Sequence, residues 1–136
     1  MNSEELAKKI REAIRGEAEA QEYYKKLIRM LKDKKDQEMV EKYILEDERK
    51  HYEQFRDILR TYTGEDYEPG NGNADISDHL TRALSEAIMD ELEAAEMYRE
   101  ILLASDEKYV RDTFFEAMTD EMEHAIRLNY LYAKYK

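Results

Sequence analysis

The tetrapeptide Glu-x-x-His occurs twice in this chain of 136 residues, from Glu48 to His51 and from Glu121 to His124. Residues three apart lie on the same face of an α-helix, so each copy would place a carboxylate beside an imidazole. Such a pair is half of a ligand set for iron or manganese, and zinc is compatible with it. One copy alone predicts little in a chain this rich in Glu. What matters is whether further ligands converge on the two motifs.

Four long helical segments are expected to carry these residues, over approximately residues 4–32, 37–62, 77–104 and 107–136. Each repeats apolar residues at intervals of three and four, which is typical of a helix with one buried face. Gly occurs only 4 times and Pro once, while the strong helix formers are abundant. Four such stripes predict an all-α four-helix bundle, built as a single domain over residues 1–136.

Residues 63–76 interrupt the helical pattern, because they hold the only Pro and three of the four Gly. Helices of roughly 26 residues are about 39 Å long, and 14 extended residues reach at most about 46–50 Å. This linker can therefore cross the whole bundle. We expect two antiparallel helical hairpins, residues 1–62 and 77–136, joined by a long crossover. Ser3 and Ser77 are the expected N-caps of the first helix in each hairpin.

The two hairpins also repeat each other in sequence. The pattern Glu-x-Glu-Ala-x-Glu-x-Tyr runs from Glu17 to Tyr24 and returns from Glu91 to Tyr98. Each half then contributes one Glu-x-x-His motif further along. We expect the halves to pack about a pseudo-twofold axis.

All four apolar stripes are interrupted near their centres by Glu, and two of these Glu are followed by His one turn later. The candidate metal ligands are Glu17, Glu48, His51, Glu91, Glu121 and His124. Each lies near the middle of its helix, so they should meet at one depth of the bundle whichever way the helices run. Unpaired buried carboxylates are costly, and two divalent cations would balance four of them. The alternative is that these residues are paired within the core or lie on the surface.

Four neighbouring residues are candidates for supporting roles. Asp47 and Asp120 precede the motif Glu residues and could each reach the His of the opposing hairpin, because a ligating His usually donates its other N–H to a carboxylate. Surface positions are the alternative for both. Tyr24 and Tyr98 lie on the stripes one or two turns beyond the Glu of their helix. They could hydrogen-bond a ligand or supply a protective electron, or they could simply pack in the core.

One Glu from each of two helices and Glu-x-x-His from the other two is a pattern that resembles the ferritin-like di-iron carboxylate proteins over essentially the whole chain. Within that superfamily the chain is most similar to rubrerythrin-type di-iron domains, in Gly16-Glu17 followed by Tyr24 and in the two Asp-Glu-x-x-His segments. The resemblance implies two iron ions bridged by Glu48 and Glu121. It also implies Glu17 and Glu91 as terminal carboxylates and one His on each ion.

Two features depart from rubrerythrins. The chain has no Cys, so it cannot form the Cys-ligated rubredoxin iron site, and electrons would come from a separate donor protein such as a rubredoxin. Rubrerythrins also carry an additional Glu that changes its ligation with redox state. Ala20 and Ala94 occupy the equivalent positions here and would leave room for a small oxidant.

The resemblance implies an oxidoreductase that reacts with hydrogen peroxide or dioxygen at a Glu₄His₂ di-metal centre. The alternatives are an iron-binding or ferroxidase protein for iron storage or delivery, and a structural module in which the polar residues are inert. A homodimer is expected from the family.

The charge and hydropathy of the chain bear on its partners and location. The net charge of −11 argues against nucleic-acid binding, which needs a basic patch. There is no apolar run of membrane-spanning length and no signal-peptide pattern at the N-terminus, so the sequence predicts a cytoplasmic protein without a membrane partner.

Overall fold

The computed structural model describes residues 1–136 and contains helices without strands. The elements are α1 (Ser3–Met30), α2 (Lys34–Val40), the π-helical turn η1 (Glu41–Leu45), α3 (Glu46–Thr63), α4 (Leu80–Ala104) and α5 (Lys108–Tyr135). Because α2, η1 and α3 follow one another without a break, they form one long helix. The chain therefore folds as four long helices, which confirms the predicted all-α bundle.

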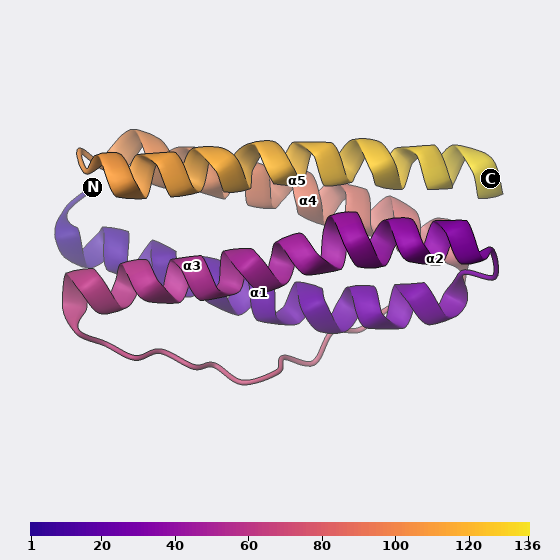
Figure 1. Ribbon diagram of the computed structural model, residues 1–136, viewed down its shortest axis with the longest axis horizontal. Helices are drawn as coiled ribbons and strands as arrows, with labels where there is room; N and C mark the ends of the chain where they lie inside the picture. The colour runs from indigo at the N-terminus through magenta and orange to yellow at the C-terminus, as the bar shows by residue number, and fades with distance from the viewer.

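The four helices lie side by side along the long axis of the molecule, with the N-terminus at one end and the C-terminus at the other (Figure 1). α1 packs against α3 and α4, and α4 packs along the length of α5. α1 and α5 run in one direction, and α3 and α4 run in the other (Figure 1). The segment between α3 and α4 returns along the outside of the α1–α3 pair.

This returning segment is fastened to the helices by polar contacts. α3 ends at Gly64, whose φ of 74° lies in the left-handed region that favours glycine. The buried Arg56 then donates hydrogen bonds to Asp66, Glu68 and the carbonyl of Tyr67. The segment is therefore fixed in position rather than loosely tethered.

Both predicted N-caps are wrong by a small margin. Asn2, not Ser3, caps α1, and its side chain accepts a hydrogen bond from the Glu5 N–H at 2.8 Å. The helix expected from Ser77 begins at Leu80. Ser77 instead accepts a hydrogen bond from the His79 N–H at 3.1 Å, so it shapes a turn that precedes α4.

The π-helical turn η1 was not predicted, and it sets the rotation of α3. Val40 and Glu48 are both almost fully buried, although they are eight residues apart. In a regular α-helix, residues with that spacing point about 80° apart. The wider i→i+5 turn accommodates one extra residue. Val40 and Glu48 can therefore both face the core.

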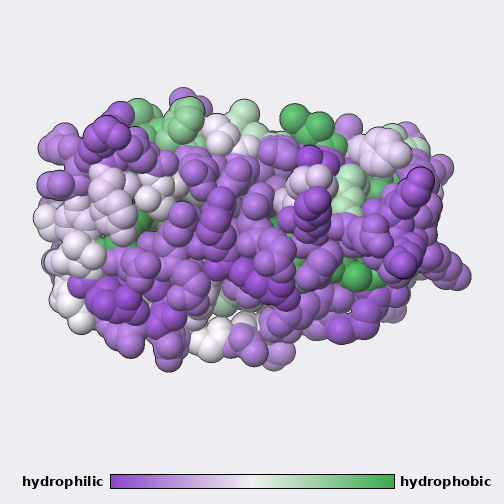
Figure 2. All heavy atoms as spheres, in the orientation of Figure 1, coloured by the Kyte–Doolittle hydropathy of each residue, from purple (hydrophilic) through white to green (hydrophobic).

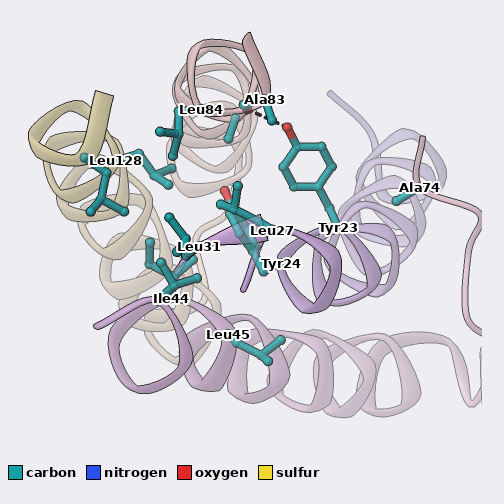
Figure 3. Close-up of a cluster of buried hydrophobic side chains, with 13 residues drawn as sticks. Tyr23, Tyr24, Leu27, Leu31, Ile44, Leu45, Ala74, Ala83, Leu84 and Leu128 are labelled. Atoms are coloured by element: carbon teal, nitrogen blue, oxygen red, sulfur yellow. Dashed lines mark hydrogen bonds between the residues drawn. The ribbon is translucent and has the colours of Figure 1, made fainter. Parts of the chain in front are cut away.

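The apolar core is divided into two clusters, one toward each end of the bundle. One contains Leu27, Leu31, Ile44 and Leu128 among its members, and Figure 3 shows these side chains meeting between the helices. The other is built around Phe55 and the residues that pack on it at the opposite end. The layer between the two clusters is polar.

Tyrosine and surface residues complete the packing. In Figure 3 the hydroxyl of Tyr23 points to the carbonyl of Ala83, to which it donates a 2.6 Å hydrogen bond that joins α1 to α4. The face of the molecule seen in Figure 2 is largely hydrophilic, with hydrophobic residues mainly along one edge and a few more between the polar side chains. Tyr62 is exposed near the end of α3. None of the helices combines the length and the apolar character that crossing a membrane requires.

Candidate metal centre

The polar layer between the two apolar clusters consists of the six residues that interrupt the helical stripes. α1 supplies one of them, α4 supplies one, and α3 and α5 supply two each. Each of these six residues is at most 3% exposed. The residues are Glu17, Glu48, His51, Glu91, Glu121 and His124. The alternative of surface positions is therefore contradicted for all six.

These residues form two overlapping groups that could each hold a metal ion. In the first, ligand atoms of Glu17, Glu48, His51 and Glu121 all lie within 4.8 Å of one another. In the second, the same holds for Glu48, Glu91, Glu121 and His124. Because Glu48 and Glu121 belong to both groups, the two candidate sites are adjacent and share two carboxylates.

Each imidazole presents one nitrogen to the carboxylates. Nδ1 of His51 lies 3.2 Å from an oxygen of Glu17 and 3.3 Å from an oxygen of Glu48. Nδ1 of His124 lies 3.3 Å from an oxygen of Glu91 and 3.5 Å from an oxygen of Glu48. Nδ1 is therefore the atom of each His that could bind a metal ion.

The other nitrogen of each imidazole contacts an Asp from the other helix of the pair α3 and α5. The Nε2–H of His51 donates to Asp120 at 2.8 Å, and the Nε2–H of His124 donates to Asp47 at 2.8 Å. Asp47 and Asp120 are only partly exposed, so they are not the free surface residues of the alternative interpretation. Each carboxylate fixes a ring orientation and directs Nδ1 toward the centre.

Two tyrosines make reciprocal contacts of the same kind between α1 and α4. The hydroxyl of Tyr24 in α1 donates a hydrogen bond to Glu91 in α4, and the hydroxyl of Tyr98 in α4 donates one to Glu17 in α1. Both tyrosines are fully enclosed, and burial together with the adjacent carboxylate raises the pKa of each hydroxyl well above its usual value. They therefore remain protonated donors that hold these two Glu side chains in place.

Electrostatics in the centre reflect its excess of carboxylates. Burial, and then the charges of Glu17 and Glu91, raise the pKa of Glu48 to about 8. Burial and the charge of Glu48 raise the pKa of Glu121 in the same direction. Burial opposes a charge on His124, but the hydrogen bonds that its ring donates to Asp47 and Glu91, together with the surrounding negative charge, raise its pKa to about 10. In the metal-free protein, protons supply the positive charge that this cluster needs.

Three oxygens of the centre have no hydrogen-bond partner. They are Oε1 of Glu17, Oε1 of Glu48 and Oε1 of Glu121, and all three are buried. Buried acceptors are normally satisfied, so each unpaired oxygen calls for an explanation. A cation bound among the carboxylates satisfies these oxygens and the charge of the cluster together. The oxygen and imidazole donors also suit iron or manganese. The residues present therefore fit a pair of divalent metal ions.

A cavity of about 420 Å³ opens onto the centre between α1 and α4. Ala20 and Ala94 line it together with carboxylates of the centre. Glu19 and Glu93 are exposed, and they also line this cavity. The repeated Glu-x-Glu pattern was the only sequence signal for this second set of carboxylates.

Fold and site together define an all-helical bundle with a buried Glu and His cluster that could bind metal ions. No protein-family model matches the chain. The chain is similar to the uncharacterized protein YhjR of Bacillus subtilis (strain 168), with 27% identity over 121 residues, which cover 89% of this chain and 82% of the relative. The name of that relative states no activity, so function rests on the site itself.

Proposed function

We propose that this chain is a ferritin-like di-iron carboxylate protein, a rubrerythrin-like oxidoreductase that reacts with hydrogen peroxide or dioxygen. The observation that carries this proposal is the pair of overlapping ligand groups that share Glu48 and Glu121. The unpaired buried oxygens of the same groups support it. On this proposal, two helical hairpins related by an internal repeat and joined by the crossover each contribute half of the centre.

Each residue of the centre then has a defined role. Glu48 and Glu121, which belong to both ligand groups, would hold both ions, while Glu17 and Glu91 would each hold one. One His would bind each ion through Nδ1. When bound, two ferrous ions would supply the two electrons that, with two protons, reduce hydrogen peroxide to two water molecules, and a separate donor protein such as a rubredoxin would return these electrons.

The surrounding residues prepare the site for this chemistry. Asp47 and Asp120 hold the imidazoles in the ring orientation that binding requires. Tyr24 and Tyr98 hold the carboxylates of Glu91 and Glu17, respectively, through hydrogen bonds. Small side chains on the cavity wall, such as Ala20, leave space for a small oxidant beside the centre.

The test compares two oxidants on one preparation. The iron-loaded protein is reduced anaerobically, mixed with hydrogen peroxide or with dioxygen, and followed by absorbance. We expect faster oxidation by peroxide, and equal or slower oxidation by peroxide would contradict the peroxidase assignment. The double variant Glu48→Ala/His51→Ala is the control, because it removes one shared and one unshared ligand and should lose the absorbance change.

Iron oxidation for storage or delivery is the alternative function, and the acidic lining of the cavity favours it. The two functions differ in what happens to iron beyond two equivalents. A ferroxidase for storage or delivery would keep oxidising added ferrous ion and release ferric ion. A peroxidase would retain two irons and consume oxidant only while it is re-reduced.

A further inference from the structure

The cavity between α1 and α4 is lined by carboxylates well beyond the centre. Outside the six candidate ligands, its acidic lining comes from three segments, namely α1, the segment between α3 and α4, and α4. These carboxylates belong to Glu12, Glu19, Asp75, Glu86, Asp90 and Glu93. The chain has 22 Lys and Arg residues, yet none of the 21 residues that line the cavity is basic.

Most of these outer carboxylates are free of basic partners. Glu12 lies 3.9 Å from Lys9, and Glu86 lies 3.2 Å from Arg82. The other four form no ion pair in the structure, and they are Glu19, Asp75, Asp90 and Glu93. Elsewhere on the surface, many of the acidic side chains are paired with nearby Lys or Arg. The cavity therefore keeps an uncompensated negative potential.

The inner end of the same cavity holds buried carboxyl groups with unpaired oxygens. Glu17, Glu48 and Glu121 line it, and each has a buried oxygen without a hydrogen-bond partner. The residues that carry these oxygens are each only 1% exposed. The cavity thus leads from exposed carboxylates to buried carboxyl groups whose oxygens have no hydrogen-bond partner.

The segment between α3 and α4 forms a fixed third wall of the cavity. Lys26 donates a 2.7 Å hydrogen bond to the carbonyl of Ala74, which holds the segment against α1 next to Asp75. Gly72 packs so closely on Glu19 that a Cβ at this position would lie 2.5 Å from the Glu19 side chain. The crossover therefore does more than connect the hairpins, because it places a carboxylate at the opening.

We propose that this cavity is the uptake route for divalent metal ions, in which Glu19, Asp75 and Glu93 capture a hydrated ferrous or manganous ion and pass it inward to Glu17. This inference rests on the proposed function, because it requires the buried centre to bind metal. Hard divalent cations take oxygen ligands. Carboxylates at the opening replace part of the hydration shell and raise the local cation concentration.

The internal repeat supports a role for Glu19 and Glu93 in metal uptake. Glu93 follows Glu19 by the same 74 positions by which Glu91 follows Glu17. The outer pair thus repeats together with the pair of candidate ligands. Capture from both α1 and α4 would deliver one ion to each half of the centre.

The test measures the rate of metal uptake separately from the final metal content. The triple variant Glu19→Gln/Asp75→Asn/Glu93→Gln removes three exposed charges and none of the six candidate ligands. Metal-free protein is mixed with Co²⁺ at low ionic strength in a stopped-flow instrument, and the visible absorbance of bound cobalt is followed. We expect uptake about ten-fold slower than in the wild type, with the same final content of two ions per chain. Added salt should reduce the difference in uptake rate, because it screens the attraction between the incoming cation and the carboxylates at the cavity opening.

A matched variant separates the effect of the carboxylates in the cavity on the uptake rate from the effect of the net charge of the protein. Glu5→Gln/Glu96→Gln/Asp106→Asn changes the net charge equally at exposed positions outside this cavity, and it should load cobalt at the wild-type rate. Equal uptake rates in the two triple variants would overturn the proposed route while leaving the metal centre intact. Absence of cobalt binding in the wild type would instead refute the proposed function.

Discussion

Replacing Glu48 by Gln should stabilise the metal-free protein and abolish the metal centre. Glu48 is buried beside other carboxylates, and burial with the charges of Glu17 and Glu91 raises its pKa to about 8. At pH 7 the folded protein therefore holds a proton on a group that is ionised in the unfolded chain. Gln keeps the shape of the side chain and needs no proton.

The size of this effect follows from proton linkage. A group with a raised pKa contributes stability that is fully present below its unfolded pKa, near 4.5, and that is lost as the pH rises through about 8. Each pH unit in that window costs about 1.4 kcal/mol. Holding the proton at pH 7 thus costs roughly 3 kcal/mol of folding free energy. Because the carboxylates titrate together and relieve one another, we expect Glu48→Gln to gain about 1–3 kcal/mol at pH 7 and much less at pH 5.

The assay is urea unfolding of chelator-treated protein at pH 5 and pH 7, repeated after metal loading. Glu96→Gln is the control, because Glu96 is exposed on α4 and should leave stability unchanged at both pH values. After loading, the wild type should gain stability and Glu48→Gln should gain far less. A metal-free Glu48→Gln protein that is less stable than the wild type at pH 7 would refute this reasoning, because Glu48 would then be a stabilising structural residue.

Three further outcomes are expected. Asp120→Asn should weaken metal affinity by about 10- to 100-fold in competition with a chromophoric chelator, and unchanged affinity would show that the contact to the imidazole is incidental. Tyr98→Phe should lower the free energy of unfolding by about 1–3 kcal/mol, because a buried carboxylate loses its donor, whereas Phe55→Ala should cost about 3–5 kcal/mol through a core cavity. Both are measured by urea unfolding, and a smaller loss for Phe55→Ala than for Tyr98→Phe would contradict the packing. Metal loading at pH 7 should release protons, because Glu48 and His124 hold them in the metal-free protein, and a pH-indicator dye in weak buffer would report none if this is wrong.

The convergence of the centre could be predicted because it depends on periodicity alone. Residues on the core stripe of a helix face the other helices, so a Glu at the middle of each stripe must meet the other three. The crosswise contacts of Asp47 and Asp120 could also be anticipated, because they precede stripe residues by one position. Distances and the tyrosine partners required the structure.

The remaining differences have local physical causes. The π-helical turn η1 has no composition signal, since its residues also suit an α-helix, and only the burial of both Val40 and Glu48 reveals it. The start of α4 depends on how the preceding segment docks, which overrides the capping preference of Ser77. The acidic cavity could not be predicted from the sequence, because it depends on the segment between α3 and α4 lying beside α1. There this segment adds Asp75 to the cavity lining.

The measurement that tests the central claim most directly is metal content after anaerobic loading with ferrous ion and removal of unbound metal. We predict two irons per chain in the wild type and loss of both in Glu48→Ala/Glu121→Ala, since both sites share these carboxylates. The exposed pair Glu96→Ala/Glu123→Ala should retain two. A wild-type protein that holds no iron, or a content that does not depend on Glu48 and Glu121, would contradict the account.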